Sequence, residues 1–293
     1  MATLSKGTLF DPTLVTDLVN KVKGKSTLTK LGLQTPVSFN GTKEFTFSMD
    51  KDIDIVAENG KKSEGGVTID PVTIIPIKFE YGARVSDEFM DAEDEEQISI
   101  LQAFNDGFAA KVARGIDLAA LHGVNPRTGT ASVVVGNNNF DTAITQTVTY
   151  DSADPDTNVE AAVALVEGSD GDVTGIGMSP VFAAALAALK TNGVKQFPEL
   201  SWGANPSAVN GIPSDKNSTI SALSSHDRAI VGDFANMFKW GYAKEIPLEV
   251  IPYGDPDNSG NDLKGSNQVY LRAEVYLGWA IMDAASFARI ITA

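Results

Sequence analysis

Residues 95–123 read EEQISILQAFNDGFAAKVARGIDLAALHG, and this stretch decides the fold class. Apolar side chains recur in it at spacings of three and four residues, which predicts one long amphipathic helix over about Glu95–Leu121. His122 and Gly123 follow, and glycine commonly ends a helix. A helix of about 27 residues would be about 40 Å long, longer than most helices of a compact domain. The positive end of the helix dipole favours negative charge, and the acids at this end are Asp87, Glu88, Asp91, Glu93, Asp94, Glu95 and Glu96.

The segment before this helix has the alternation of β-strands. Apolar and polar residues alternate around Phe45 and Phe47 and again over residues 75–81. Between these runs, residues 58–66 read ENGKKSEGG, a charged stretch with glycines that favours a turn. We therefore expect a long β-hairpin over residues 42–85, whose tip projects into solvent or onto another molecule. Because a two-stranded ribbon is marginally stable alone, its length indicates support from a partner.

The remainder of the chain alternates short strands and helices and closes with one long strand. Val269–Ile281 alternates apolar and polar residues, and this strand is too long for a small domain alone. Ser179 and Pro180 predict the N-cap and the first position of a helix. Together with the long helix, these patterns predict an α+β fold. The other expected elements are strands at 133–135, 145–150, 229–233 and 249–252, helices at 12–22, 158–167 and 180–190, and a loop with short strands at 197–218.

Composition excludes several classes of protein. The 293 residues are 43% hydrophobic, which is enough for a large core or two modest ones. A net charge of -15 excludes a protein that clamps nucleic acid over its whole surface, although the first 30 residues form a basic arm with five lysines and two aspartates. The absence of cysteine excludes disulfides, thiolate nucleophiles and iron–sulfur clusters. No stretch resembles a secretory signal or a bilayer span, so we expect a soluble chain made inside the cell.

The sequence contains no arrangement typical of an active site. His122 and His226 are the only histidines, and neither has the spacing of a metalloprotease helix. His226 and Asp227 lie beside serines, but adjacency in sequence does not bring a nucleophile and a base together, so a surface turn is favoured. The residues around Ser179 lack the second glycine of a nucleophile elbow. We therefore predict that the chain is not an enzyme and uses no cofactor.

The best metal-like pattern is DPDNSGN at residues 255–261. It places acids and a glycine where a calcium loop has them, but Ser266 stands at the twelfth position in place of the usual glutamate. Asp50, Asp52 and Asp54 alternate along an extended segment and form a weaker pattern. Solvated acids are the favoured interpretation in both places, with calcium as the alternative for the loop, so no metal site is predicted.

Several short motifs follow one another in a characteristic order. They are IVAENG at 55–60, RVSDE at 84–88, IDLAALHG at 116–123, MSP at 178–180 with Lys190, NGIP at 210–213, GDF at 232–234, VYLRAE at 269–274 with Gly278, and ASF at 285–287. With the basic arm, the hairpin, the long helix and the returning strand, their order and spacing resemble the major capsid proteins of tailed double-stranded DNA bacteriophages. The resemblance covers nearly all of the chain from about residue 30.

This resemblance implies the tailed-phage major capsid fold and a division of the chain into four parts. Residues 1–41 correspond to the N-terminal arm, and residues 42–83 to an extended hairpin loop that reaches over a neighbouring subunit. Residues 84–128 with 269–293 correspond to the peripheral domain, whose spine is the long helix. Residues 129–268 correspond to the axial domain, whose tips meet at capsomer centres.

The implied function is structural. A major capsid protein self-assembles into hexamers and pentamers of an icosahedral shell that encloses the viral double-stranded DNA genome. The resemblance further implies a location in the virion capsid, assembly in the host cytoplasm, a portal partner and no membrane. No long charged helical segment precedes the arm, so a separate scaffolding protein is implied. The packaged DNA is expected to be enclosed without sequence-specific binding, with the acidic residues on the inner wall.

Three other interpretations remain open on the sequence. A protein-compartment (encapsulin-like) shell of the same fold would enclose a cargo enzyme. A tail-tube subunit would form rings or tubes, although the long helix argues against it. A hydrolase would need a pocket with convergent polar groups.

The hairpin tip is the predicted contact with a neighbouring subunit. Lys61 and Lys62 are flanked by Glu58 and Glu64, without an apolar anchor, so the tip is expected to contribute orientation and electrostatic complementarity. Some family members cross-link a hairpin lysine to an asparagine; Lys61 and Lys62 lie in the corresponding place, but no asparagine can be assigned. The predicted partner of the tip is the densest acidic cluster of the chain, Asp91, Glu93, Asp94, Glu95 and Glu96.

Overall fold

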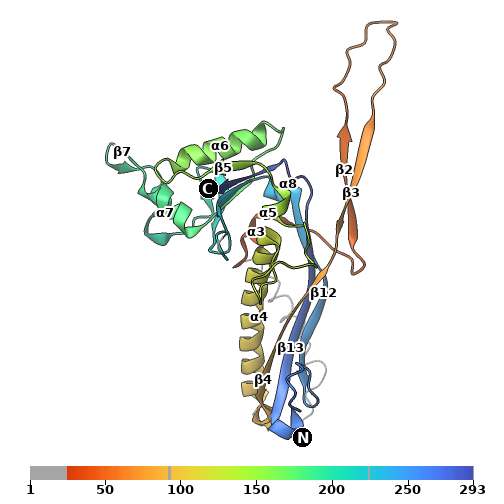
Figure 1. The fold of residues 1–293 in the computed structure, drawn as a ribbon, viewed down its shortest axis with the longest axis vertical. Helices are drawn as coiled ribbons and strands as arrows, with labels where there is room; N and C mark the ends of the chain where they lie inside the picture. Colours follow the sequence, from red (N-terminus) through yellow and green to blue (C-terminus); the bar gives the residue numbers. More distant parts are fainter. Residues whose placement is uncertain (1–24, 92–93, 224, 293) are drawn as a thin grey trace.

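The computed structural model describes residues 25–91, 94–223 and 225–292, which form an elongated molecule with three parts (Figure 1). The first part, the shaft, consists of one long helix and a four-stranded sheet. The second, the compact unit, contains a six-stranded sheet and lies beside one end of the shaft. The third is a two-stranded hairpin that projects beyond both. None of the described helices is both long and apolar enough to cross a membrane.

The helix of the shaft, α4, spans Asp94–His122 and confirms the predicted long helix. Phe108, Val112 and Ile116 on one of its faces are buried in the core. The helix ends at Gly123, whose φ of +66° is costly for any residue with a Cβ. A Cβ at this position would also lie 2.6 Å from Asn139 Nδ2, so both the turn and the packing require glycine.

The sheet of the shaft confirms the long returning strand. β13 (Gln268–Ile281) pairs antiparallel with β12 (Phe238–Ile251) on one side and with β4 (Ile77–Ser86) on the other, and β1 (Leu33–Gln34) pairs parallel with β12. The short strand expected at 249–252 is therefore the end of a much longer one. Trp240 faces Trp279 across the sheet, and both side chains are buried in the core that includes α4.

The hairpin consists of β2 (Thr42–Met49) and β3 (Val67–Ile74), paired antiparallel with Thr42 opposite Ile74. The predicted hairpin ran to residue 85, and this is wrong beyond Ile74. The next strand, β4, leaves the ribbon and joins the sheet of the shaft. Pro76 stands between the two strands and has no N–H to continue a ladder, which accounts for the break.

The compact unit is built around a sheet with the strand order β5-β14-β11-β6-β10-β9. Its strands are β5 (Thr147–Thr149), β14 (Phe287–Ile291), β11 (Asp227–Gly232), β6 (Gly175–Met178), β10 (Ile212–Lys216) and β9 (Ala208–Val209). The predicted helices are present as α6 (Pro155–Glu167) and α7 (Pro180–Ala188). Val166, Phe182 and Leu186 from these helices pack with Ile176 and Val231 of the sheet into a second core.

The shaft and the compact unit share a cluster of four aromatic rings. Phe140 lies 5.2 Å from Phe287, 5.7 Å from Phe238 and 6.1 Å from Phe234, measured between ring centroids. Three short helices surround this junction: α3 (Thr27–Leu31), α5 (Phe140–Ala143) and α8 (Phe234–Met237). The two parts are therefore joined by a continuous apolar core.

Several expected elements differ from the structure. Residues 133–135 form a turn, the helix expected at 12–22 lies outside the described residues, and β14 was not predicted. Strand pairing also crosses two expected boundaries, because β12 joins the shaft and β14 joins the compact unit. The remaining elements are η1 (Asp87–Asp91), β7 (Lys190–Thr191), β8 (Val194–Lys195), η2 (Pro198–Gly203) and η3 (Lys264–Ser266).

Candidate assembly surfaces

The hairpin exposes apolar side chains along its two strands and in part of the segment that connects them. Ile53 and Ile55, in the segment that connects its two strands, are 93% and 96% exposed. A continuous apolar surface of this kind is uncommon on a monomer and marks a site of interaction. Ile77 and Phe79, which fall within the range predicted for the hairpin, pack instead against the core of the shaft, and the side chain of Phe47 lies outside the described residues. The exposed set is Phe45, Met49, Ile53, Ile55, Val56, Val67, Ile69 and Ile75.

The tip of the hairpin presents only charged and small residues. Glu58, Lys61, Lys62 and Glu64 are all exposed, and none of the four forms an ion pair with another described side chain. Asn59 adopts φ +64° at the turn, as asparagine tolerates better than most residues. The charges of the tip are therefore available to a second molecule.

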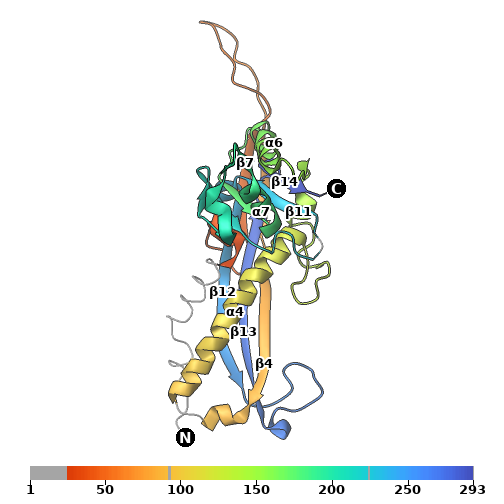
Figure 2. The ribbon, with the colours of Figure 1, turned by 90° about the vertical axis from the view of Figure 1, so that its left-hand side faces the viewer.

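The predicted partner of the tip lies at the far end of the same molecule. The side chains of Asp91, Glu93, Asp94, Glu95 and Glu96 fall outside the described part, but η1 ends at Asp91 and α4 begins at Asp94. That end of α4 is at the foot of the shaft, whereas the tip extends beyond the opposite end (Figures 1 and 2). Contact between the two would therefore have to form between different molecules.

A groove of about 750 Å³ runs along the shaft between β4, α4 and the turn at 124–135. Phe79, Gly115 and Pro126 line its floor, and Tyr81 and Val134 line it with exposed side chains. The groove is therefore partly apolar. It lies along α4, the helix whose first residues are the predicted partner of the tip.

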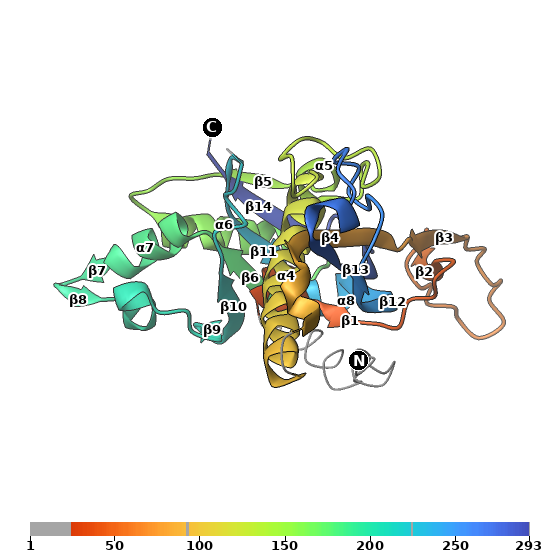
Figure 3. The same ribbon diagram turned by 90° about the horizontal axis from the view of Figure 1, so that it is seen from below.

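The compact unit carries a second exposed surface at its outer end. The side chain of Trp202 in η2 is fully exposed, and the residue adopts φ +60°. Val194, in the small β7–β8 hairpin beside it, is also exposed. Seen along the shaft, this end and the β2–β3 hairpin point to opposite sides of the molecule (Figure 3). One chain thus presents two outward surfaces that could meet different neighbours.

The residues weighed as a hydrolase fragment have structural roles. The Ser179 hydroxyl accepts a hydrogen bond from Phe182 N at 3.3 Å, which confirms the helix cap. His226 is exposed, as expected of a surface turn, but Asp227 is fully buried and that part of the prediction is wrong. It begins β11 and accepts a hydrogen bond from Arg289 Nε at 3.0 Å.

Asp227 belongs to a buried ionic cluster that joins the shaft to the compact unit. Arg289 of β14 also donates from Nη2 to Asp141 Oδ1 at 2.6 Å. The other oxygen of Asp141 lies 2.9 Å from Nδ1 of His122, the last residue of α4. The cluster was not predicted because its four members come from four elements that are distant in sequence.

The two neighbours of His122 favour its protonated form. Its Nε2 lies 2.9 Å from the carbonyl oxygen of Thr219, and its Nδ1 faces Asp141. Both are acceptors, and this arrangement favours a proton on each ring nitrogen. Burial opposes the charged form, but the hydrogen bonds to Asp141 and Thr219 raise the pKa of His122.

Burial raises the pKa of Asp227 to about 7, against the attraction of Arg289. Burial also opposes ionisation of Asp141, yet hydrogen bonds from His122 and Asp227 and the charge of Arg289 lower the pKa of Asp141. One ligand atom each from His122, Asp141 and Asp227 lies within 4.8 Å of the others, a spacing that could hold a metal ion. The guanidinium of Arg289, 2.6 Å from Asp141 Oδ1 and 2.9 Å from Asp227 Oδ1, opposes the binding of a cation at this place.

A second buried carboxylate ties α3 to α4. Asp117 accepts hydrogen bonds from Ser26 Oγ at 2.6 Å, from the backbone N–H groups of Thr27 and Leu28, and from Thr219 Oγ1 at 2.9 Å. Burial raises the pKa of Asp117 to about 6, although these donors favour the ionised form. Residues 26–28, in the last part of the basic arm, are thereby fixed to α4 near its C-terminal end.

Comparison with known proteins finds similar proteins over nearly the whole chain. The profile of the phage capsid family matches residues 6–290. A solved structure from Mycobacterium phage Ogopogo is 31% identical, with a TM-score of 0.78 over 92% of each chain. One from Gordonia phage Cozz is 23% identical, with a TM-score of 0.75 over 91% of this chain and 86% of that one. No curated protein matches the chain.

A structure described as the capsid of an empty GTA particle has the same fold at 18% identity, with a TM-score of 0.65 over 92% of this chain and 90% of that one. The long helix, the projecting hairpin and the two sheets described above are thus the tailed-phage capsid fold. The family profile, the identity to the Ogopogo structure and this fold together place the chain in the phage capsid family, as a structural protein of the capsid shell.

Proposed function

We propose that this chain is the major subunit of an icosahedral shell, that it assembles into hexamers and pentamers, and that the shell encloses a double-stranded DNA genome. The observation that carries the proposal is the hairpin, which exposes an apolar surface that no other part of the described chain covers. Burying that surface requires a neighbouring molecule, because a two-stranded ribbon cannot bury it alone.

Geometry supports a specific arrangement of neighbours. The hairpin of one subunit lies over the shaft of the next, along the groove between β4 and α4, and its lysines approach the acids at the start of the neighbour's α4. The outer end of the compact unit, with Trp202, faces the centre of the capsomer. Each surface then meets a different copy, as a closed ring within a shell requires.

The chain divides accordingly into an arm, a hairpin loop, a peripheral domain and an axial domain. In this division β12 goes with the peripheral domain and β14 with the axial domain, because the strands pair in that way. The protein has no catalytic role, since the histidines and buried acids serve structural contacts. A separate scaffolding protein and a portal act with it during assembly in the host cytoplasm, and the net charge of -15 keeps the inner wall from adhering to DNA.

Electron microscopy of the purified chain and of particles from host cells tests the proposal. We expect closed shells with six-fold and five-fold capsomers, and nuclease-resistant DNA inside particles isolated from the host. Open tubes or persistent monomers would contradict the shell. Closed particles that hold a cargo protein and no DNA would show instead that the chain forms a compartment.

A further inference from the structure

The groove along the shaft carries positive charge on a strongly acidic chain. Lys111 and Arg114 of α4 and Arg127 of the turn line it, and all three side chains are exposed. None of them forms an ion pair with another described residue. Because the whole chain has a net charge of -15, the groove is a local surface of the opposite sign, and it attracts an acidic partner.

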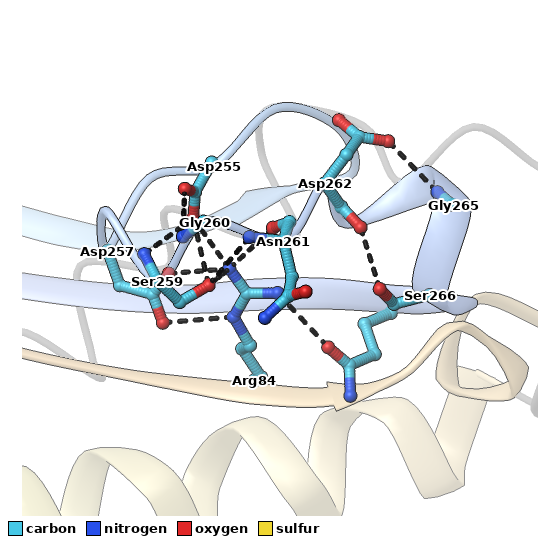
Figure 4. A network of polar contacts seen from close by, with 10 residues as sticks. Arg84, Asp255, Asp257, Ser259, Gly260, Asn261, Asp262, Gly265 and Ser266 are labelled. Atoms are coloured by element: carbon cyan, nitrogen blue, oxygen red, sulfur yellow. Dashed lines mark hydrogen bonds and ion pairs between the residues drawn. The ribbon is translucent and has the colours of Figure 1, made fainter.

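Other charges of the shaft are paired within the chain. Lys78 and Glu80, which also line the groove, lie 3.3 Å apart. Further along β4, Arg84 Nη2 lies 2.8 Å from Asp255 Oδ1 and 2.5 Å from Asp257 Oδ1 (Figure 4). The loop that resembles a calcium site in sequence therefore has both of its acids paired with this arginine. The three unpaired cations of the groove differ from these residues in having no acid at hand among the described residues.

The groove also has an apolar part. Gly115 lies against Phe79 and Pro126, and a Cβ at this position would lie 3.3 Å from Phe79 Cε1 and 3.5 Å from Pro126 Cγ. The side chains of Tyr81 and Val134, which line the same groove, are 47% and 74% exposed. A well-matched partner therefore combines negative charge with apolar side chains.

The connection between the two strands of the hairpin has this combination. Its residues 50–58 read DKDIDIVAE, in which Asp52 and Asp54 alternate with Ile53 and Ile55. All four side chains are exposed, and neither carboxylate forms an ion pair with another described residue. Successive side chains of an extended chain point to opposite sides. The segment can therefore turn its acids to one wall of a groove and its isoleucines to the other.

The lengths of two segments agree with this placement. Lys61 comes eight residues after Ile53, which is about 26 Å in an extended chain. Val112, which lines the groove, comes 18 residues after Asp94, the first residue of α4, which is about 27 Å along the helix. With Ile53 in the groove and the tip directed to the foot of the neighbouring shaft, the lysines of the tip reach the acids at the start of the same α4.

We propose that residues 52–55 of the hairpin bind in this groove on a second copy of the chain, where Asp52 and Asp54 pair with its three cations. The inference rests on the proposed assembly and names the residues that hold its hairpin. The two surfaces differ, so the contact is head-to-tail, and every copy offers one surface of each kind. A nucleic acid would pair with the cations through its phosphates but leave the apolar part of the groove in water, so a second copy fits better.

Charge exchange between two full-length variants tests the proposal. The hairpin variant carries Asp52→Lys and Asp54→Lys, and the groove variant carries Arg114→Glu and Arg127→Glu. Each variant alone should associate at least about tenfold more weakly than the natural chain, because like charges then face one another at every contact. An equal mixture should regain association, because each hairpin then meets a groove of opposite charge on the other chain. Sedimentation velocity measures association, and the melting temperature of each variant should match that of the natural chain.

A control variant separates this contact from a general effect of net charge. Glu160→Lys with Glu167→Lys changes the net charge by the same amount as the hairpin variant, but these exposed acids belong to α6, outside the groove. Its association should equal that of the natural chain. Natural association of either charge-exchange variant alone, or a mixture that stays dissociated, would overturn the proposal. Duplex DNA that binds the natural chain but not the groove variant, with association of subunits unchanged, would assign the groove to nucleic acid instead.

Electron microscopy of the same samples separates this contact from the shell. Closed shells that form in spite of both charge reversals would leave the proposed function standing and remove the contact. Rings or open sheets of the natural chain, with the expected loss and recovery on charge exchange, would keep the contact and remove the shell. A natural chain that stays monomeric at high concentration would overturn both.

Discussion

The compact unit buries its apolar residues, whereas the hairpin exposes them. In the compact unit, two helices and a six-stranded sheet bury one another, and Val166, Phe182 and Ile290 are completely enclosed. In the hairpin, Phe45 is 65% exposed and Ile55 almost fully so. The first region is stable because of contacts within the chain, whereas the described residues provide no such contacts for the exposed side chains of the second. Folding and assembly are therefore encoded in different residues.

The largest expected effect is on assembly. Replacing Ile53 and Ile55 together with serine should abolish shell formation, because both side chains are almost fully exposed in the subunit and available only to a neighbour. The free energy of unfolding of the unassembled chain should change by less than about 0.5 kcal/mol. Sedimentation and urea unfolding measure the two quantities. The matched control replaces Leu165 and Val181, which are exposed on the compact unit, with serine. The comparison fails if the control stops assembly as completely as the hairpin variant, or if the hairpin variant unfolds.

A second test applies the same measurement to two phenylalanines. Phe140→Ala should lower the free energy of unfolding by about 3–5 kcal/mol, because its ring is fully buried where the shaft meets the compact unit. Phe45→Ala should change it by less than about 0.5 kcal/mol in the unassembled chain. Urea unfolding at low protein concentration compares the two. Similar losses for both would show that the hairpin is folded onto its own chain.

A third prediction concerns pH. The pKa of Asp227 is raised to about 7 and that of Asp117 to about 6, both by burial, so between about pH 4 and 7 the folded chain holds protons that the unfolded chain releases. The free energy of unfolding should therefore fall as pH rises through this window. The raised pKa of His122 acts in the same direction above its ordinary value of 6.5.

Asp227→Asn should reduce that slope, and urea unfolding of the unassembled chain across the same pH range measures it. The exposed Asp262 offers the control, since Asp262→Asn should leave the slope unchanged. A free energy of unfolding that rises from about pH 4 to 7 would contradict the assignment of these buried carboxyls.

The smallest effect is expected at the tip. Replacing Lys61 and Lys62 with glutamate should weaken association of subunits without altering the fold, because both lysines are exposed and the predicted partner is acidic. Added salt should weaken assembly of the natural chain more than that of the variant, since it screens an attraction that only the natural chain has. Light scattering during assembly measures both, and replacement of the same lysines with arginine is the control. Normal assembly of the glutamate variant at low salt would remove the tip from the interface.

The sequence predicted the helices, strands and caps whose signal lies in residues that are close together in the chain. The helix at 94–122 follows from apolar spacing, β13 from alternation, and the cap at Ser179 from the residue that precedes a proline. The same reasoning missed β14, a short strand whose residues are nearly all buried and therefore show no alternation.

What could not be predicted depends on residues that are distant in sequence. Pairing of Arg289 with Asp141 and Asp227 brings together three separate elements, and no spacing within the sequence indicates it. The loop at 255–261 was recognised as calcium-like, but its occupant, Arg84, lies 171 residues away from Asp255. The sequence predicted only part of the exposed face of the hairpin. Alternation shows that a ribbon has two different faces, but no sequence pattern shows which strand will leave the ribbon for another sheet.

Because α4 is long, a small rotation about one of its ends moves the other end through a large distance. Its 29 residues extend over about 44 Å, and the ionic cluster around His122 lies at one end. A rotation of about 10° about that end carries the other end through roughly 7–8 Å, by the same helix geometry. A small change in the angle of α4 at His122 therefore becomes a large displacement of the other end of the helix, at the foot of the shaft. In the shell proposed above, a lever of this kind lets identical chains meet their neighbours at different angles, as pentamers and hexamers require.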